Sequence, residues 1–299
     1  MSAPAISARS LTKFYGADRG VESLDFSVGQ GEIFGFLGPN GAGKTTTIRL
    51  LLDLIRPTSG RVEIFGREPR SNPAARGRVG YLPGDLRLYE RLTGREFLAY
   101  FARLRGLTSL GVAPDLAERF DLELDRPIKS LSKGNRQKIG LVQAFMHEPD
   151  LLVLDEPTSG LDPLVQQAFY ELLQEVRAAG RTVFLSSHVL PEVQHVADRV
   201  GLLREGALIL VETVETLRAR AFARVEVTLA QPAAPTAFAD VPGVQELERH
   251  NSSILFALHG EPDALVKALA GHHVIGLDSH EADLEDVFLS LYGEVRDAR

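Results

Sequence analysis

The fold is decided by residues 38–45, which read Gly38-Pro39-Asn40-Gly41-Ala42-Gly43-Lys44-Thr45. An apolar run, 33–37, precedes this stretch, and residues 46–52 after it have the composition of a helix. Strand, glycine loop with Lys-Thr, and helix form the context that the phosphate-loop pattern requires. Glycines let backbone N–H groups turn toward a polyphosphate, and the helix N-terminus adds partial positive charge. The stretch therefore predicts a nucleoside-triphosphate site, with Lys44 reaching the β- and γ-phosphates and Thr45 ligating magnesium.

Composition limits the classes of protein that this loop can serve. The chain has 299 residues, enough for one large or two ordinary domains, and its 44% hydrophobic content is that of a globular protein. The net charge of −7 argues against a nucleic-acid partner, because binding phosphate backbones depends on clustered Lys and Arg. Cysteine is absent, which fits the cytosol and excludes disulfides. No signal peptide is read, and no apolar run approaches the ~20 residues of a membrane span.

Strands and helices alternate through the first 220 residues. The patterns predict strands at residues 6–15, 21–28, 33–37, 61–65, 79–82, 150–154, 182–185, 200–203 and 207–211. A helical insert is expected at about 84–130, where Thr93 and Glu96 form a capping-box pattern. One face of its first helix is apolar and carries Phe97, Tyr100, Phe101 and Leu104. Further helices are expected after Ser132 and after Asp162. This alternation predicts an α/β fold with a mainly parallel sheet covered on both faces.

The texture of the sequence changes after about residue 220. Residues 224–229 and 253–258 read as strands, 231–242 as a loop, and 262–269 as a helix. A last helix is expected to carry one apolar stripe, formed by Leu284, Val287, Phe288 and Leu291. We therefore expect a nucleotide-binding domain at 1–220 and a small α+β accessory domain at 221–299.

A second set of polar residues follows the apolar run 151–154. A buried strand would hold Asp155 at its carboxyl end, where ligands sit in open parallel sheets. An aspartate at this place in a phosphate-loop enzyme supports the magnesium site. Glu156, next to it, is suited to act as the general base on a water in line with the γ-phosphate.

Taken together, these motifs resemble those of the nucleotide-binding subunit of ABC transporters, over roughly residues 5–220. Residues 38–45 match the family's Walker A motif, and Asp155-Glu156 matches the end of Walker B. Three further stretches match the signature, the D-loop and the switch histidine: Leu131-Ser132-Lys133-Gly134-Asn135, Ser159-Gly160-Leu161-Asp162 and Ser186-Ser187-His188. Tyr15 matches the aromatic residue that stacks on adenine. Singly, Tyr15 or His188 would be ordinary residues; it is the ordered set that carries the resemblance.

The resemblance implies an ATPase that closes ATP and Mg²⁺ between two subunits. The nucleotide would contact Tyr15, Thr46 and the whole loop from Gly38 to Thr45 of one subunit. Ser132 and Gly134 of the other subunit would face the γ-phosphate, and His188 would hold that phosphate together with Glu156. Thr45 and Asp155 would hold the metal ion. One Walker A and one signature per chain imply a second copy, or a close relative, in each functional unit.

Two departures from the family pattern affect the site. The family usually has Gln, or sometimes Glu, at the position of Gly84, where the side chain touches magnesium and the attacking water. Two alternatives stay open. In one, Asp85 or a water replaces the missing side chain; in the other, the sequence of this loop varies freely. The signature has Lys133 and Asn135 in place of Gly and Gln, but it keeps Gly134. With Thr45, Asp155 and Glu156 intact, we expect hydrolysis to survive.

The resemblance extends to one branch of the family. Residues 80–83, 88–93 and 284–289 resemble ATPase subunits of drug-, antibiotic- and lipid-exporting systems of the daunorubicin-resistance type. This implies a separately encoded permease, docked near Gly84 with Leu86, Leu88 and Tyr89 as wall residues, and a location on the inner face of the cell membrane. Two alternatives stay open: a soluble ABC ATPase acting on nucleic acid or ribosomes, and an importer subunit whose extension is regulatory.

Overall fold

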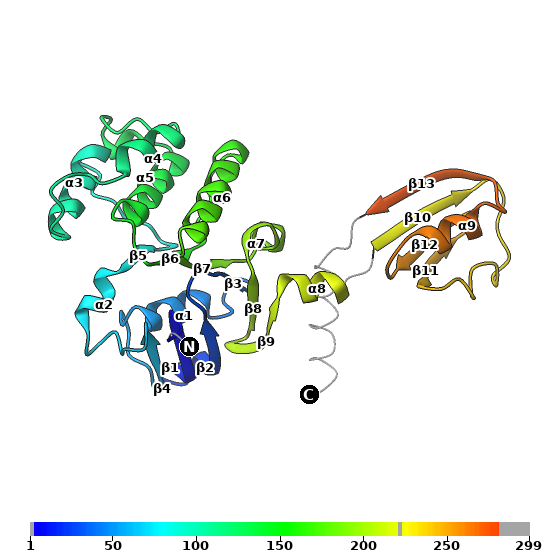
Figure 1. The fold of residues 1–299 in the computed structure, drawn as a ribbon, viewed down its shortest axis with the longest axis horizontal. Helices are drawn as coiled ribbons and strands as arrows, with labels where there is room; N and C mark the ends of the chain where they lie inside the picture. The colour runs from blue at the N-terminus through cyan, green and yellow to red at the C-terminus, as the bar shows by residue number, and fades with distance from the viewer. Residues whose placement is uncertain (1–2, 221–222, 281–299) are drawn as a thin grey trace. The chain divides into compact units, whose positions relative to one another are not determined.

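The computed structural model describes residues 3–220 and 223–280. The chain folds as two compact units, Met1–Thr213 and Val214–Arg299 (Figure 1). The apolar stripe expected at 284–291 lies outside the described residues, as does the segment 284–289 that suggested the exporter branch. Within the described ranges, no helix is both long and apolar enough to cross a membrane.

A six-stranded sheet forms the centre of the first unit, with the order β5-β6-β7-β3-β8-β9. Its strands are β3 (Ile33–Leu37), β5 (Val79–Leu82), β6 (Leu151–Asp155), β7 (Thr182–Ser187), β8 (Arg199–Arg204) and β9 (Ala207–Thr213). All neighbours are parallel except the β8–β9 hairpin, so the expected mainly parallel sheet is confirmed. In the register, Leu37 lies opposite Ser187 and Asp155 opposite Ser186. The strand that leads to His188 thus lies between the phosphate-loop strand and the Asp155 strand.

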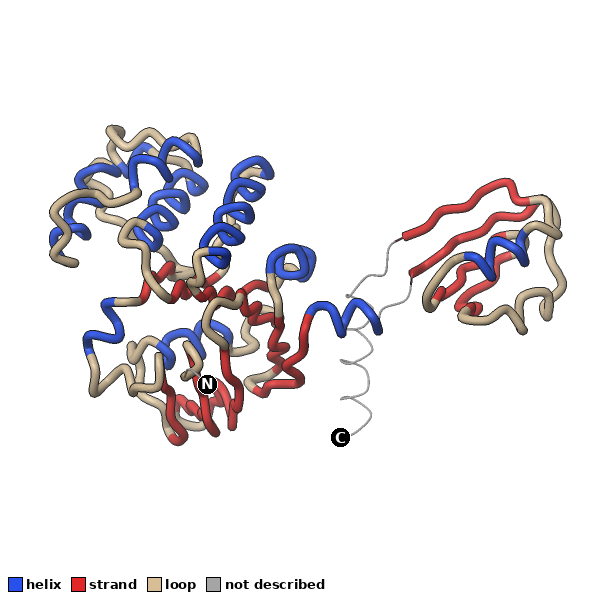
Figure 2. Tube along the Cα trace, in the orientation of Figure 1, coloured by secondary structure: helices blue, strands red, loops and turns tan. Residues whose placement is uncertain are grey.

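A second sheet in this unit is antiparallel and was not foreseen as a separate layer. It has the order β2-β1-β4, formed by β1 (Ile6–Tyr15), β2 (Asp18–Val28) and β4 (Ser59–Ile64). Strands β1 and β2 are joined by a two-residue connection, which allows antiparallel pairing alone. Phe26 of this sheet packs its ring on Phe36 and Phe184 of the central sheet, with centroids 5.6 and 6.1 Å apart. Helix α1 (Lys44–Leu51) contacts strands of both sheets (Figure 2).

The remaining helices of the first unit frame these sheets. They are α2 (Pro73–Gly77), α3 (Gly94–Leu104), α4 (Ala113–Arg119), α5 (Lys133–Phe145), α6 (Pro163–Ala178) and α7 (Leu190–Val196). The capping box at α3 is confirmed, since Thr93 and Glu96 satisfy each other's backbone N–H groups. The expected apolar face of α3 is covered only in part: Phe97 is buried, but Tyr100 is 42% and Leu104 64% exposed.

The second unit is a four-stranded antiparallel sheet with helices. Its elements are α8 (Val214–Arg220), β10 (Ala223–Leu229), β11 (Val244–His250), β12 (Ser253–Leu258), α9 (Asp263–Leu269) and β13 (Val274–His280), and its strand order is β11-β12-β10-β13. The strands expected at 224–229 and 253–258 are confirmed. The sequence analysis missed β11 and β13. Strand β11 is mostly exposed and charged, so it lacks the apolar alternation that marks a half-buried strand.

Candidate functional site

The phosphate loop follows β3 as a close-packed turn. A Cβ added at Gly38 would lie 2.3 Å from the Leu203 carbonyl oxygen, and Gly43 has φ +109°, which strongly favours glycine. The Ala42 carbonyl accepts a hydrogen bond of 2.9 Å from Gly206 N in the β8–β9 turn. The loop is therefore fixed by the neighbouring hairpin, while Pro39, Asn40 and Gly41 remain exposed at its tip.

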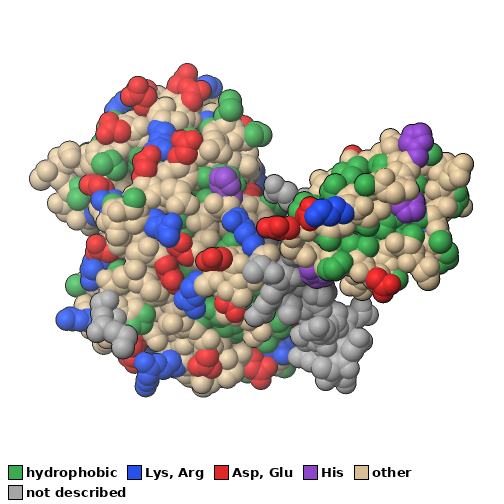
Figure 3. Space-filling view, turned by 45° about the vertical axis from the view of Figure 1, so that its right-hand side comes forward, with side chains coloured by type: hydrophobic (Ala, Val, Ile, Leu, Met, Phe, Trp, Pro, Cys, Tyr) green, Lys and Arg blue, Asp and Glu red, His purple; other side chains and the backbone are tan. Residues whose placement is uncertain are grey.

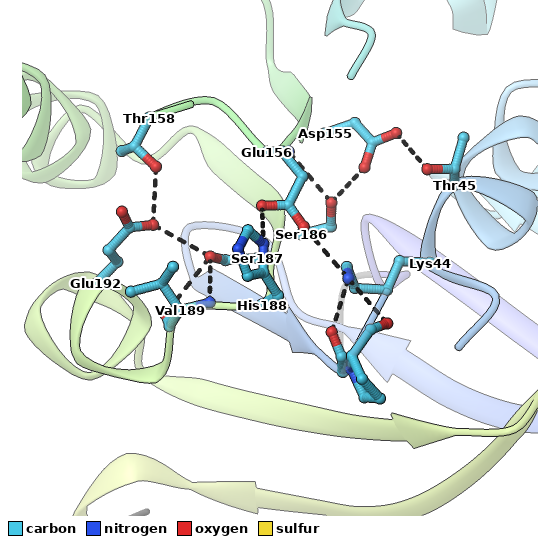
Figure 4. A network of polar contacts seen from close by, with 12 residues as sticks. Lys44, Thr45, Asp155, Glu156, Thr158, Ser186, Ser187, His188, Val189 and Glu192 are labelled. Atoms are coloured by element: carbon cyan, nitrogen blue, oxygen red, sulfur yellow. Dashed lines mark hydrogen bonds and ion pairs between the residues drawn. The ribbon is translucent and has the colours of Figure 1, made fainter. Parts of the chain in front are cut away.

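Lys44 is held inside the loop that precedes it. Its Nζ donates hydrogen bonds to the carbonyl oxygens of Gly38 (2.6 Å) and Pro39 (3.3 Å). The same Nζ lies 3.2 Å from Glu156 Oε1, and this buried oxygen receives no hydrogen bond of good geometry (Figure 4). The lysine side chain is 6% exposed and that of Glu156 is 21% exposed. The cation from the phosphate loop and the carboxylate from the end of β6 thus form an ion pair shielded from bulk water.

Asp155 is fully buried and is held on both carboxylate oxygens. Thr45 Oγ1 donates to Oδ2 at 2.8 Å, and Ser186 Oγ donates to Oδ1. Burial, with the charge of Asp155 as the next cause, raises the pKa of Tyr81 on β5 to about 12. A hydroxyl beside a rigid carboxylate is a hard oxygen donor set, and Mg²⁺ commonly uses one carboxylate together with substrate phosphates. The residues present therefore fit the metal that the sequence predicts.

Glu156 and His188 meet across the ends of β6 and β7. His188 Nδ1–H donates to Glu156 Oε2 at 2.8 Å (Figure 4). Glu156 has φ +51°, a strained conformation for this residue, and its backbone N–H is fixed by the Ser186 carbonyl oxygen at 3.1 Å. The structure thus brings Lys44, Thr45, Asp155, Glu156 and His188 into one network.

Tyr15 lies beside the start of α1. A Cβ added at Gly20 would be 2.9 Å from Tyr15 Cε2 and 3.2 Å from Thr46 Cγ2, so both side chains face the same glycine. The ring is 45% exposed and has Lys13 Nζ 5.2 Å from its centroid. An exposed aromatic face beside the phosphate loop is a surface on which a planar base can stack.

The two signature residues lie apart from this network. Ser132 caps α5 by accepting a hydrogen bond of 3.2 Å from Asn135 N. A Cβ at Gly134 would be 2.6 Å from the Gly160 carbonyl oxygen, so Gly134 is needed for packing on the D-loop of its own chain. In the described part of the chain, no hydrogen bond or ion pair joins Ser132 or Gly134 to Lys44, Asp155 or His188.

Gly84 and Asp85 lie at the end of β5. A Cβ at Gly84 would be 3.1 Å from Asp155 Oδ2, so this position faces the carboxylate at close range. Asp85 is exposed and instead accepts hydrogen bonds of 3.2 and 3.1 Å from the Arg87 guanidinium. Leu86, expected as a wall residue, packs on α5, because a Cβ at Gly140 would be 2.6 Å from Leu86 Cδ2.

Sequence reasoning missed several polar side chains that hold the site. Gln137 on α5 donates a hydrogen bond of 3.0 Å to the Pro157 carbonyl oxygen, next to Glu156. Glu192 on α7 accepts hydrogen bonds from Thr158 and Ser187, which flank Glu156 and His188 in sequence. The hydroxyls of the Ser186-Ser187 pair were the one available signal, since two buried serines at a strand end need partners.

Comparison with known proteins agrees with this geometry. A family model described as ABC transporter matches residues 21–159. The chain is 35% identical over 297 residues to the bacitracin transport ATP-binding protein BcrA of Bacillus licheniformis, covering 96% of this chain and 97% of that protein. It is also 35% identical to the Nod factor export ATP-binding protein I of Cupriavidus metallidurans, over 97% of this chain and 98% of that one.

A solved structure of an ATP-binding subunit of an ABC transporter is similar in fold. It is 33% identical, has a TM-score of 0.68, and covers 72% of this chain and 92% of its own. The ordered motifs, the strand order that assembles them and these relatives lead to one conclusion. The chain belongs to the ABC transporter family and is an ATP-binding, ATP-hydrolysing subunit of that family.

Proposed function

We propose that this ATPase powers a separately encoded membrane permease that exports drugs, antibiotics or lipids. The observation that carries the proposal is the extent of the match, since the two relatives named for bacitracin transport and Nod factor export are similar along 96% and 97% of this chain. The similarity therefore includes the second unit as well as the nucleotide-binding core. On this proposal the chain works as a peripheral protein on the inner face of the cell membrane.

The contacts at the site support a division of roles. Lys44 exchanges its carbonyl acceptors, Gly38 O and Pro39 O, for β- and γ-phosphate oxygens of ATP. Thr45 and Asp155 hold Mg²⁺, which when bound supplies positive charge against the developing charge on the phosphates. Glu156 takes the proton of the attacking water as general base, and His188 orients its carboxylate through the 2.8 Å hydrogen bond.

A second cassette completes the site. The chain has one phosphate loop and one signature, and in this chain the start of α5 is engaged with Gly160. Ser132 and the backbone N–H groups around Gly134, at the N-terminus of the 13-residue α5, would bind the γ-phosphate held by the other subunit. Tyr15 stacks on the adenine of the nucleotide bound by its own loop.

The helical insert offers a surface for the permease. Tyr89 and Tyr100 are 56% and 42% exposed, and their ring centroids are 5.7 Å apart. With Glu90, Arg91 and Leu92 they line a hollow of about 420 Å³. Exposed aromatic and arginine side chains are enriched at protein interfaces. We assign the docking of a permease segment to Tyr89 and Tyr100, with Leu86 supporting the insert from inside.

The face drawn in Figure 3 does not carry a field of one charge sign. On the face drawn in Figure 3, acidic and basic side chains of the first unit are interspersed. Non-specific nucleic-acid binding depends on a field of one sign, formed by clustered Lys and Arg.

The test is purification of the tagged full-length chain from gently solubilised membranes of its native cell. We expect a polytopic membrane protein to copurify in near-stoichiometric amount. The variants Tyr89→Ala and Tyr100→Ala should weaken the coupling of ATP hydrolysis to this partner, which would locate the contact. Recovery from the soluble fraction with RNA or ribosomal proteins attached would contradict the proposal. Dependence of the ATPase on a separate binding protein would favour an importer instead.

A further inference from the structure

Glu192 joins the two loops that carry Glu156 and His188. It lies on α7, four residues after His188. Its Oε2 accepts hydrogen bonds from Thr158 Oγ1 at 2.8 Å and from Ser187 Oγ at 3.1 Å (Figure 4). Thr158 follows Glu156 by two residues, and Ser187 directly precedes His188. A single carboxylate oxygen therefore bridges the end of β6 and the end of β7.

Both hydroxyls that donate hydrogen bonds to Glu192 are buried. Ser187 has no exposed surface and Thr158 is 6% exposed. Ser187 Oγ already accepts a hydrogen bond of 2.9 Å from Val189 N, and its other acceptor, the Val189 carbonyl oxygen, is 3.4 Å away. Buried hydroxyls that lose their acceptor destabilise the conformation that buries them. The carboxylate therefore favours one arrangement of the two loops over others.

The arrangement that Glu192 favours is the one in which Glu156 and His188 are in contact. Their hydrogen bond of 2.8 Å links the same two loops a second time. General-base catalysis depends on such placement, because displacing a reacting group by about 1 Å can lower a rate by about 100-fold. A residue that fixes both loops thus controls how often the base is correctly oriented.

We propose that Glu192 is a positioning residue for ATP hydrolysis, holding Glu156 and His188 in register through Thr158 and Ser187. The inference rests on the proposed roles of Glu156 and His188. The alternative is a purely structural role, in which Glu192 packs α7 against α6, where Tyr170 lies close to its charge. That role would change the stability of the chain and leave the chemical step unaltered.

The test compares Glu192→Ala with Glu192→Gln in the full-length chain and its copurified membrane partner. For Glu192→Ala we expect kcat to fall by about 10- to 100-fold, with the KM for ATP within about threefold because the phosphate loop is untouched. Glu192→Gln keeps an acceptor oxygen for both hydroxyls and should restore most of kcat. The control is Glu171→Ala on α6, whose carboxylate pairs with Arg119 at 3.6 Å; its kcat should equal that of the wild type.

A double-mutant cycle with Thr158→Val tests whether Glu192 acts through this hydroxyl. Since both changes break the same contact, the double variant should be no slower than Glu192→Ala alone. Independent, multiplying losses would overturn the proposal, as would a wild-type kcat in Glu192→Ala or equal losses in Ala and Gln. If Glu156→Gln is inactive and Glu192→Ala is normal, this inference alone fails. If Glu156→Gln hydrolyses ATP normally, the proposed role of the base fails first.

Discussion

Strands β5 and β6 are hydrogen-bonded neighbours in one sheet, yet their carboxyl ends differ in what holds them. Strand β6 ends in Asp155, fully buried, with a hydroxyl on each carboxylate oxygen. Strand β5 leads into Gly84 and Asp85, which are exposed, and Asp85 turns to the Arg87 guanidinium. The closed end of β6 carries the groups suited to the chemistry, and the open end of β5 faces them with a glycine, which has no side chain.

The difference follows from the places of the two strands in the sheet. Strand β6 lies between β5 and β7, whereas β5 is at the edge and has one neighbour. An inner strand end can be held from the adjacent strand and from the helix that follows the phosphate loop, as Ser186 and Thr45 hold Asp155. An edge strand end lacks this support on one side. Rigid placement of the carboxylates thus comes from β7 and α1.

The largest expected effect on ATPase activity is that of Glu156→Gln, at the closed end of β6. The exchange keeps the size of the side chain but removes the base, so we expect kcat to fall by about 10²- to 10⁴-fold. The groups placed to bind ATP remain, and a dimer trapped with ATP should therefore appear in size-exclusion chromatography. Steady-state ATPase of the full-length chain checks the first point. Turnover at the normal rate would refute the role given to Glu156.

Removal of the hydroxyl on β7 should have the next largest effect. In Ser186→Ala, Asp155 keeps the Thr45 contact and loses its partner on Oδ1, and a hydrogen bond to a buried charge contributes about 1.5–3 kcal/mol. We expect kcat to fall by about tenfold and the Mg²⁺ concentration for half-maximal activity to rise. Thr182→Val is the matched control: it removes a buried hydroxyl from the other end of β7, where Thr182 accepts from Gly31 N. Equal Mg²⁺ dependence in both variants would show that Ser186 does not hold the metal site.

The contrast between strand ends also shows what the sequence could reveal of the site. Lys44, Asp155 and Glu156 lie in local patterns, a glycine loop and an apolar run, which mark them without a structure. Ser186 and Glu192 have no such pattern, because their hydrogen bonds reach partners 31 and 34 residues away in the chain. Side chains that we propose to act on ATP can be predicted from local sequence patterns, whereas the side chains that hold them in place depend on the strand order.

The same reasoning explains the outcome for the fold. Strands with apolar alternation or a continuous apolar run were predictable, and β5 and β12 have the expected bounds. Strand β11 was missed because Glu246, Glu248 and Arg249 replace the alternation. The exposure of Tyr100 and Leu104 on α3 could not be foreseen, since periodicity predicts that residues share a face but not whether that face is covered.

The open end of β5 can be probed by filling the space beside Asp155. In Gly84→Ala the new Cβ would lie 3.1 Å from Asp155 Oδ2, and φ at Gly84 is outside the left-handed region, so the exchange tests space alone. We expect kcat to fall by about threefold because the carboxylate must shift. Asp85→Ala should change the ATPase by less than about twofold, since this carboxylate contacts Arg87 at the surface. A larger loss in Asp85→Ala would mean that Asp85 replaces the side chain missing at Gly84.

The smallest effect is expected at the other end of β5, which is anchored by two side chains. His147 Nε2–H and Arg105 Nη2 both donate to the Val79 carbonyl oxygen, at 3.3 and 3.1 Å. Burial, and secondly the charge of Arg105, lowers the pKa of His147 from 6.5 to about 4. As pH falls, the imidazole is therefore protonated in the unfolded chain before it is protonated in the folded chain. The contribution of His147 to stability is complete above pH 6.5 and is lost as pH falls toward 4.

For a partly exposed histidine this contribution is about 1 kcal/mol after solvent screening. We expect His147→Gln to remove that part of the pH dependence, so that its free energy of unfolding in urea changes less than the wild type's between pH 6.5 and 4. His250→Gln, at a side chain that is 83% exposed, is the control and should follow the wild type. If His147→Gln keeps the full pH dependence, β5 is not anchored through a neutral imidazole. This end of β5 would then be held by Arg105, whose guanidinium donates to the Gly77 and Val79 carbonyl oxygens and stays charged throughout this pH range.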